Sequence, residues 1–303
     1  MNEPPPEQVP SAACWWHPSR PTGLSCVRCG RAACPDCLRE APVGYQCVDC
    51  AHETRRPRRR SEAGTTQVAP RPVITSVLIA LNVLVYGFTT LQARNPVDND
   101  RAALFGDWVL WPRAIAGADE WWRLVTSGFL HYGPIHLGVN MISLWILGRD
   151  MEALFGKLRF SVIYLVSLLG GAVSVYLMDD SNRGTAGASG AIYGLLGGLL
   201  VVVLRLRLNP MPAIVTIALN LVITLSIPNI SLLGHLGGLV AGALVTAAII
   251  YAPSGHRKAW QVVSVAVLVL ALAALVWSRD ADLAGVVCDH KAGQLLCSAP
   301  SGT

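Results

Sequence analysis

The chain has 303 residues, of which 52% are hydrophobic and only 14% are charged, against about a quarter charged in ordinary globular proteins. The formal net charge at pH 7 is +5, and the mean hydropathy is +0.45. The stretches after residue 72 are too long and too apolar for a soluble fold of this size to bury on every side, which excludes a purely soluble enzyme, a disordered regulator and a fibrous protein. The composition predicts an all-α polytopic membrane protein with a small polar N-terminal domain.

Seven of the nine cysteines lie within residues 14–50, where they form, with one histidine, four pairs separated by two residues. Thiolate and imidazole ligands at this spacing are typical of zinc, and eight ligands fill two closed tetrahedral sites. The short intervals between the pairs favour an interleaved arrangement. One ion would be bound by Cys14, His17, Cys34 and Cys37, and the other by Cys26, Cys29, Cys47 and Cys50, with His52 as a spare ligand. We therefore expect residues 1–52 to form a domain with two structural zinc ions.

The alternative for these cysteines is a disulfide cluster in a secreted domain. Residues 1–10 are rich in proline and have no apolar core, so no signal peptide is expected before the cysteines. A segment with so few aliphatic residues would hardly fold without its metal. These points favour zinc in a reducing compartment, and the partner of this domain is not readable from the sequence.

Residues 53–72 form a basic linker that contains six arginines. An arginine run can bind nucleic acid. Directly before an apolar segment, however, it more often marks the cytoplasmic side of a membrane protein. We expect the second role and no nucleic-acid partner.

Seven apolar segments follow the linker, and most approach the roughly 20 residues with which a helix spans a bilayer. They are residues 73–91, 135–147 (extendable to 155), 160–178, 186–204, 211–227, 231–252 and 260–277. With a cytoplasmic N-terminus, the basic residues of the short loops fall on the inner side, as the positive-inside rule requires. This predicts a multi-pass cell-membrane protein whose C-terminal tail, residues 278–303, is extracytoplasmic.

The connection between the first two segments, residues 92–134, is long and rich in tryptophan. Clustered tryptophan is typical of the headgroup layer of a bilayer. Loops of this length are usually functional or disordered, and this one is too apolar to be disordered. We expect it to lie partly in the outer leaflet.

Polar side chains inside spans are costly, so each is a candidate functional residue. His136 and Asn140 are four residues apart at the outer end of the second segment, so they share a helix face. Ser189 and His235 lie at the outer ends of the fourth and sixth segments. A lone serine in a span usually bonds to a carbonyl of its own helix, and a lone histidine can be a proton relay or a packing residue. The common depth of all four residues favours a shared site.

Glycine ridges accompany two of these residues and would let their helices approach closely in lipid. The ridges consist of Gly190, Gly194 and Gly198 in one segment and Gly234, Gly238 and Gly242 in the other. If they pack together, the Ser189 hydroxyl and the His235 imidazole meet as a nucleophile and its general base. No carboxylate occurs in the apolar segments near this depth, so a dyad is expected. His136 and Asn140 would supply oxyanion donors, and Tyr193 would either stack on His235 or be an ordinary core tyrosine.

The last two cysteines, Cys288 and Cys297, lie in the tail that is expected to be extracytoplasmic. Disulfides persist in such an oxidising environment. We expect the two cysteines to be bonded, with two free thiols on a disordered tail as the alternative.

These motifs resemble those of the rhomboid intramembrane serine proteases. The matching residues are, in order, Trp122, Arg123, Thr126, His131, His136, Asn140, Gly187, Ala188, Ser189, Gly190, Gly234, His235 and Gly238. The resemblance implies a six-helix rhomboid core over residues 73–252 and an additional seventh transmembrane helix within residues 253–277. The cysteine-rich domain resembles the zinc-binding extension of some actinobacterial rhomboids.

The resemblance further implies a serine endopeptidase (a hydrolase) that cleaves single-span membrane proteins near the outer face of the lipid bilayer, with no cofactor for catalysis. Ser189 would be the nucleophile and His235 the general base. His136, Asn140 and the backbone N–H of Ser189 would form the oxyanion hole.

Residues 94–131 would be the membrane-embedded outer loop, anchored by Trp122 and Arg123, and His131 would help hold that loop and water near the site. One alternative is a non-catalytic rhomboid-like protein that binds membrane clients, which would need neither Ser189 nor His235. Another is a transporter with a histidine proton relay. That reading predicts inverted repeats or broken helices with acidic residues in the core, and the sequence shows neither.

Overall fold

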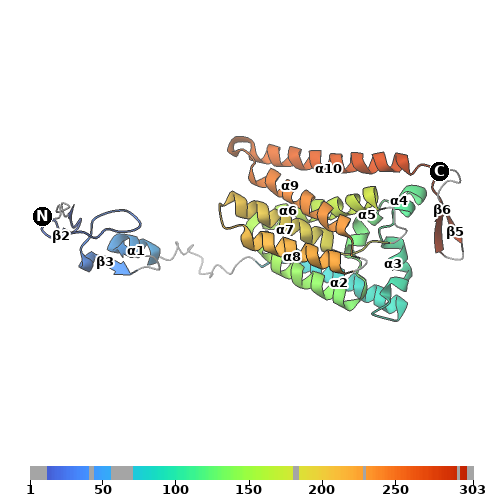
Figure 1. Ribbon diagram of the computed structural model, residues 1–303, viewed down its shortest axis with the longest axis horizontal. Helices are drawn as coiled ribbons and strands as arrows, with labels where there is room; N and C mark the ends of the chain where they lie inside the picture. Colours follow the sequence, from blue (N-terminus) through green and yellow to red (C-terminus); the bar gives the residue numbers. More distant parts are fainter. Residues whose placement is uncertain are drawn as a thin grey trace, which may run out of the picture. The chain divides into compact units, whose positions relative to one another are not determined.

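The structure, a computed structural model of the chain, describes residues 12–40, 44–55, 71–179, 184–227, 230–291 and 294–298 (Figure 1). The chain divides into two compact units, residues 1–68 and 69–303, and each is described by itself. The greater part of the arginine-rich linker, residues 56–70, lies outside the described residues. Residues 180–183 and 228–229, in two short connections between apolar segments, lie outside them as well.

The N-terminal unit is built from two small hairpins and a helix. In the first hairpin, strand β1 (Ala12–Ala13) pairs antiparallel with β2 (Pro21–Thr22). The 3-10 helix η1 (Pro35–Cys37) then leads into the second hairpin, in which β3 (Leu38–Glu40) pairs antiparallel with β4 (Tyr45–Cys47). Helix α1 (Val48–Arg55) follows directly. The buried core consists mainly of the cysteines, with a few small or apolar neighbours such as Ala33 and Leu38. So small an apolar core supplies little folding free energy by itself.

The second unit is formed mainly by apolar helices. They are α2 (Val73–Ala93), α6 (Gly133–Met178), α7 (Ser189–Arg205), α8 (Met211–Ser226), α9 (Leu232–Ile250) and α10 (Arg257–Asp282). Among the described residues, α2, α6, α9 and the segment Ser254–Asp282 are long and apolar enough to cross a membrane, and α7 and α8 are shorter apolar helices. Helix α6 is broken at Gly156, whose φ is 75°. The expected segments 135–147 and 160–178 therefore lie in separate halves of α6, while the number of membrane crossings stays a prediction.

Helices α6, α7 and α9 pack against one another in the core of this unit, and α10 runs beside α9 (Figure 1). The two glycine ridges meet, as expected from their spacing. A Cβ at Gly242 on α9 would lie 2.2 Å from the carbonyl oxygen of Gly194 on α7. Contact this close between backbones is possible only where no side chain intervenes.

The long connection between α2 and α6 is ordered rather than disordered. It contains the 3-10 helix η2 (Asn99–Arg101), helices α3 (Ala103–Trp108), α4 (Pro112–Ala118) and α5 (Arg123–Thr126), and the 3-10 helix η3 (Ser127–Phe129). The side chain of Asn99 is fully buried and donates to the carbonyl oxygen of His131 (2.9 Å), while its oxygen accepts from the N–H of Gly133 (3.0 Å). This side chain ties the loop to the start of α6.

Glu152 on α6 holds the N-terminus of α2. Its carboxylate accepts hydrogen bonds from the backbone N–H groups of Ile74 (3.0 Å) and Thr75 (2.8 Å) and from the Thr75 hydroxyl (2.9 Å). The first N–H groups of a helix have no partner within the helix, and a negative charge there is favourable. Glu152 therefore joins the two helices although it is itself buried.

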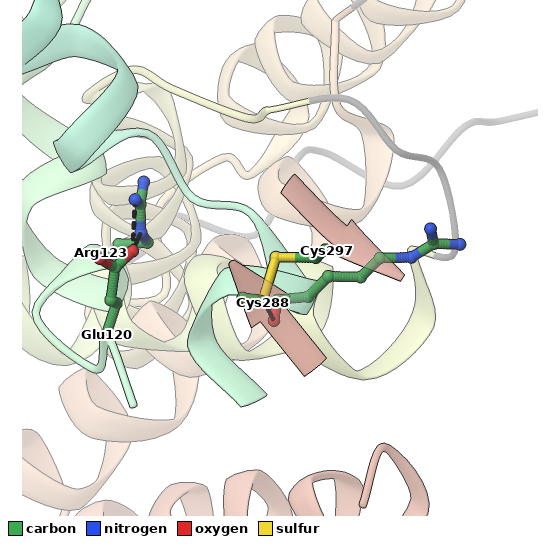
Figure 2. The surroundings of a disulfide bond; sticks show 5 residues. Glu120, Arg123, Cys288 and Cys297 are labelled. Atoms are coloured by element: carbon green, nitrogen blue, oxygen red, sulfur yellow. Dashed lines mark hydrogen bonds and ion pairs between the residues drawn. A yellow bond between two sulfur atoms is a disulfide. The ribbon is translucent and has the colours of Figure 1, made fainter. Parts of the chain in front are cut away.

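The described residues of the tail after α10 include a hairpin. Strands β5 (Val287–Lys291) and β6 (Gln294–Ser298) are antiparallel, with Cys288 opposite Cys297. The two cysteines form a disulfide (Figure 2). The Cys288 sulfur lies 3.4 Å from the carbonyl oxygen of Arg113 on α4, so the hairpin packs against the loop between α2 and α6.

Candidate functional site

Ser189 is the first residue of α7, and His235 lies in the first turn of α9. The Ser189 Oγ and the His235 Nε2 are 2.8 Å apart. His235 is buried, and Ser189 is partly exposed. The two side chains that the sequence singled out are thus brought within hydrogen-bonding distance by the meeting of the glycine ridges.

The other ring nitrogen of His235 faces α8. Its Nδ1 lies 2.8 Å from the Thr224 Oγ1, which is also 2.8 Å from the Tyr193 hydroxyl. The rings of Tyr193 and His235 are stacked, with centroids 4.0 Å apart and an interplanar angle of 12°. The sequence places Tyr193 near His235 but gives no signal for Thr224, because a threonine in an apolar helix is unremarkable.

His136 lies beside Ser189 at the start of α6. A Cβ at Gly187 would be 3.0 Å from the His136 Nε2 and 3.6 Å from the Ser189 Oγ, so glycine is required where the two side chains converge. The His136 Nδ1 accepts the backbone N–H of Tyr132 (3.2 Å). In the neutral ring the proton must then sit on Nε2, on the side that faces Ser189.

Asn140 is buried one turn after His136, and its Nδ2 donates to the His136 carbonyl oxygen (2.9 Å). That bond uses one of the two amide hydrogens. The second hydrogen remains available for another acceptor. Asn140 therefore both supports the first turn of α6 and retains a donor.

His131 is fully buried and packs edge-on against His136, with ring centroids 5.1 Å apart. Among the described residues, neither ring nitrogen of His131 has a hydrogen-bond partner. A buried polar group in this state is usually satisfied by ordered water. The structure thus places the His131 ring directly beside His136.

Trp122 and Arg123 make their hydrogen bonds within the outer loop. The Trp122 indole N–H donates to the carbonyl oxygen of Asp107 (3.1 Å). The buried Arg123 guanidinium donates to the carbonyl oxygens of Gly106 (2.6 Å) and Val109 (2.8 Å) and forms an ion pair with Glu120, shown in Figure 2. Both residues are therefore placed to stabilise the fold of the loop.

The N-terminal unit groups its cysteines and histidine as the spacing predicts. Cys14, His17, Cys34 and Cys37 form one cluster, and Cys26, Cys29, Cys47 and Cys50 form the other, with the ligand atoms of each cluster within 4.8 Å of one another. These two groups of four have the composition of structural zinc sites. Of His52 the structure describes only the backbone.

Distances within the clusters fit a tetrahedral ion. The His17 Nδ1 lies 3.5 Å from the Cys34 sulfur and 3.3 Å from the Cys37 sulfur, and the sulfurs of Cys29 and Cys47 are 3.7 Å apart. Zinc with Zn–S about 2.3 Å and Zn–N about 2.0 Å separates its ligand atoms by about 3.5–3.8 Å.

One thiol of each cluster is also prone to ionise. Burial acts to raise the pKa of Cys14, but hydrogen bonds from backbone N–H groups, those of Cys34 and Trp16 first, outweigh it and lower the pKa to about 6. Burial likewise acts to raise the pKa of Cys26, but hydrogen bonds from backbone N–H groups, that of Cys47 first, outweigh it and lower the pKa to about 6. Cysteine binds metal as the thiolate, so the donor set fits zinc.

Comparison with known proteins places the second unit in a family. The Rhomboid domain family matches residues 118–252, which include Ser189, His235, His136 and Asn140. The chain is 32% identical over 198 residues to the "Putative rhomboid protease YdcA" of Bacillus subtilis, covering 62% of this chain and 93% of that protein. The chain belongs to the rhomboid family. The protein is therefore embedded in a membrane, as its apolar helices indicate.

Other rhomboids match over part of their length. The "Rhomboid protease GluP" of Bacillus subtilis is 34% identical over 196 residues, which are 63% of this chain and 37% of that protein. The "Rhomboid protease AarA" of Providencia stuartii is 29% identical over 217 residues, and the match covers 61% of this chain and 75% of that protein. For the "RHOMBOID-like protein 4" of Arabidopsis thaliana, the chain covers 35% of that protein's length. The chain thus spans about a third of the length of some of its relatives.

Proposed function

We propose that this rhomboid is an intramembrane serine endopeptidase that cleaves single-span membrane proteins near the outer face of the bilayer. The observation that carries the proposal is the 2.8 Å contact between the Ser189 Oγ and the His235 Nε2, in a chain related to proteins named as rhomboid proteases. The alternative, a non-catalytic protein that binds membrane clients, gives no reason for a serine and a histidine to be held in this geometry.

In the proposed reaction the Ser189 Oγ attacks the scissile carbonyl carbon while its proton passes to the His235 Nε2. The tetrahedral intermediate collapses when His235 returns the proton to the leaving amine nitrogen, which breaks the peptide bond and leaves an acyl-enzyme. Water, deprotonated by His235, then attacks the ester carbonyl carbon. The resulting intermediate collapses as His235 returns that proton to the Ser189 Oγ, which releases the carboxylic acid product and the free Ser189 hydroxyl. No step requires a cofactor.

Three groups are proposed to stabilise the oxyanion. Ser189 is the first residue of α7, so its backbone N–H belongs to the set that a helix leaves unpaired, at the positive end of the helix dipole. The proton on the His136 Nε2 and the second amide hydrogen of Asn140 supply two further donors. Donors that are already oriented toward the developing charge lower the barrier because they need no reorganisation.

We propose that the N-terminus is cytoplasmic and the C-terminus extracytoplasmic, which the distribution of basic loop residues supports. On this orientation Ser189 lies near the outer face, next to the loop of residues 94–131. Trp122 and Arg123 stabilise that loop, and His131 supplies the site with water. Substrates would then be cut near the outer edge of the bilayer.

The proposed domain organisation follows from the same arguments. Residues 1–52 form the zinc-binding domain, which carries two structural zinc ions, and residues 53–72 form the linker. Residues 73–252 form the rhomboid core, residues 253–277 the seventh transmembrane helix and residues 278–303 the tail. Two clusters of four ligand atoms at tetrahedral spacing support the zinc assignment.

A fluorophosphonate probe, which labels only activated serines, tests the catalytic proposal in the full-length protein. We expect labelling of the wild type, together with cleavage of a single-span reporter, and loss of both in Ser189→Ala and in His235→Ala. Ser226→Ala is the matched control, because that serine is exposed on α8 and donates to the Val222 carbonyl oxygen (2.7 Å). An unlabelled wild type that still binds membrane proteins would favour the client-binding alternative.

A further inference from the structure

Thr224 is the one buried polar side chain of α8 and lies on the side of His235 opposite Ser189. Its Oγ1 is 2.8 Å from the His235 Nδ1, 2.8 Å from the Tyr193 hydroxyl and 2.9 Å from the carbonyl oxygen of Asn220. Three polar groups thus converge on a single hydroxyl, which has one hydrogen and two lone pairs.

Counting hydrogens assigns the direction of each bond. The Asn220 carbonyl oxygen can only accept, so it takes the Thr224 hydrogen. The Thr224 oxygen is then an acceptor toward the Tyr193 hydroxyl and toward the His235 Nδ1–H. A neutral His235 therefore carries its proton on Nδ1 and presents the lone pair of Nε2 to the Ser189 Oγ. This is the tautomer that a general base requires.

We propose that Thr224 is a positioning residue that does part of what a carboxylate does in a Ser-His-Asp triad, an inference that rests on the proposed catalytic function. It fixes the tautomer and orientation of His235, and it holds the stacked Tyr193 ring through the Tyr193 hydroxyl. The sequences of α7, α8 and α9 contain no Asp or Glu. Thr224 is neutral, so it orients the imidazole without providing the charge that stabilises an imidazolium.

The position of Thr224 on α8 links this role to the packing of that helix. Of the 16 residues of α8, those that are buried are Ala213, Ile217 and Thr224. A helix with so few buried side chains is held weakly by packing. A displacement of α8 would therefore remove the acceptor of the Nδ1–H, so the base is correctly oriented only while α8 is docked.

The test compares hydroxyl-bearing and hydroxyl-free variants in the full-length protein. Thr224→Val keeps the shape and removes the hydroxyl, Thr224→Ala is a second hydroxyl-free variant, and Thr224→Ser restores the hydroxyl. Thr216→Val is the matched control, since Thr216 is exposed on the same helix and bonds to the Pro212 carbonyl oxygen. The readouts are the rate of fluorophosphonate labelling, kcat and KM for a reporter, and the midpoint of thermal unfolding.

Loss of one oriented hydrogen bond should lower the labelling rate and kcat about tenfold in the hydroxyl-free variants, with KM unchanged. Thr224→Ser should recover most of the rate, and Thr216→Val should retain all of it. Equal labelling rates in the valine, alanine and serine variants would overturn the positioning role while leaving the dyad intact. Absence of labelling in the wild type would instead overturn the proposed function, and the role of Thr224 with it.

A second inference comes from the other ends of α7 and α9. A cavity of about 200 Å³ is lined there by residues of α6, α7, α9 and α10, among them Arg159, Arg205, Arg257 and Gln261. The rest of its wall is apolar and includes Leu154, Phe155, Val202, Leu206, Ile249 and Ile250. No carboxylate is among the lining residues, so three arginine residues line one cavity with no acidic residue in its wall.

Two of these arginines are oriented by their neighbours. The Arg159 Nε donates to the Gln261 Oε1 (3.3 Å), and the Gln261 Nε2 donates to the Ile249 carbonyl oxygen (2.9 Å). The Arg205 guanidinium lies over the Tyr251 ring, 5.3 Å from its centroid. These contacts leave terminal guanidinium N–H groups for another acceptor, and guanidinium groups match phosphate oxygens in pairs.

We infer that this cavity binds the phosphate of an anionic phospholipid, with the lipid chains against the apolar wall. The positive-inside rule explains basic residues at this end of a membrane protein, but it does not require three of them to share one cavity. Basic pockets between transmembrane helices are a recognised way to hold anionic headgroups. The apolar wall favours a lipid over a free phosphate ion.

Lipid retention tests this inference independently of catalysis. The full-length protein is reconstituted with phosphatidylglycerol or phosphatidylcholine, and bound lipid is counted by mass spectrometry after purification in detergent. The variant Arg159→Gln/Arg205→Gln/Arg257→Gln is compared with Lys157→Gln/Arg149→Gln/Arg207→Gln, which removes the same charge outside the cavity lining.

We expect phosphatidylglycerol to be retained by the wild type and by the control, and to be lost from the cavity variant. Equal loss from both variants, or equal retention of phosphatidylcholine, would overturn the site. Displacement of the lipid by inorganic phosphate alone would overturn the lipid assignment and leave a simple anion site.

Discussion

A Cβ on Gly238 of α9 would lie 2.0 Å from the carbonyl oxygen of Gly190 on α7. The two backbones therefore touch with no side chain between them. Gly190 directly follows Ser189, and Gly238 is three residues after His235, less than one turn along α9. This contact sets the distance between the two helices at the level of the dyad, so the geometry of the site depends on the absence of a methyl group.

Gly238→Ala should accordingly push α9 away from α7. Overpacking of this kind usually costs about 1–3 kcal/mol, and the contact between Ser189 and His235 should be lost as well. We expect a lower thermal midpoint and little or no fluorophosphonate labelling. Gly87→Ala on α2 is the control, because a Cβ there meets nothing within 4 Å. It should leave the labelling unchanged and should not lower the thermal midpoint, since alanine is favoured over glycine inside a helix. Wild-type behaviour of Gly238→Ala would show that the helices tolerate a wider spacing.

Asn140→Ala should weaken cleavage without abolishing it. One oxyanion donor is typically worth about 10²–10³ in kcat, and the Ser189 N–H and the His136 Nε2–H would remain. The effect should fall on kcat rather than on KM, since the oxyanion forms only in the reaction. Steady-state kinetics on a single-span reporter provide the measurement, with thermal unfolding to check the fold. An unchanged kcat would exclude Asn140 from the oxyanion hole.

The contrast between Ser189 and Thr224 shows what can be predicted from the sequence. Ser189 and His235 are recognisable because each adjoins a glycine ridge, and two such ridges can be expected to pack together. Thr224 bonds to the carbonyl oxygen four residues earlier, as most helical threonines do. Its contact with His235 arises only from the way α8 docks, which no local pattern encodes.

The role of Glu152 cannot be predicted from the sequence for a different reason. It lies among the charged residues that follow the second apolar segment, where a carboxylate is normally expected to face solvent. Its burial is due to the unpaired N–H groups of α2, which lie far away in the sequence. The break of α6 at Gly156 is also hard to predict from this segment, because one helix ends and the next begins without a loop between them.

Glu152→Ala should destabilise the rhomboid core. It removes a buried, charged acceptor from two backbone N–H groups and one hydroxyl, and hydrogen bonds to charged groups contribute about 1.5–3 kcal/mol each. Asp150→Ala is the matched control, since that exposed carboxylate pairs with Arg149 and such pairs are worth about 0–1 kcal/mol. Thermal unfolding in detergent should separate the two variants clearly. Equal midpoints would mean that α2 is held by its apolar contacts alone.

The N-terminal domain should contain about two zinc ions per chain, one for each cluster of four ligands. Elemental analysis of the purified protein measures this directly. Cys14→Ser and Cys26→Ser should each lower the zinc content by one, because they belong to different clusters. Deleting residues 1–52 should leave the labelling of Ser189 intact, since these residues belong to a different compact unit of the chain from Ser189. A purified protein without zinc would refute the assignment.

The disulfide between Cys288 and Cys297 should order the loop between α2 and α6 locally. A Cβ on Gly117 of α4 would lie 2.7 Å from the Cys288 sulfur, so the hairpin rests on the loop at a point where only glycine fits. Closing a loop this small stabilises the tail by about 2–3 kcal/mol. In the variant Cys288→Ser/Cys297→Ser we expect faster hydrogen exchange in residues 112–118, with little change in the helices of the core.

Mass spectrometry of the unreduced protein tests the bond, and alkylation of intact cells tests its location. If the tail is extracytoplasmic, a thiol reagent that cannot cross membranes should label both cysteines in intact cells, but only after a reductant is added. Labelling of both thiols in unreduced intact cells would contradict the disulfide. Labelling that appears only when the membrane is broken, without any reductant, would contradict the disulfide and the topology together, because free thiols would then lie on the same side as the zinc-binding domain.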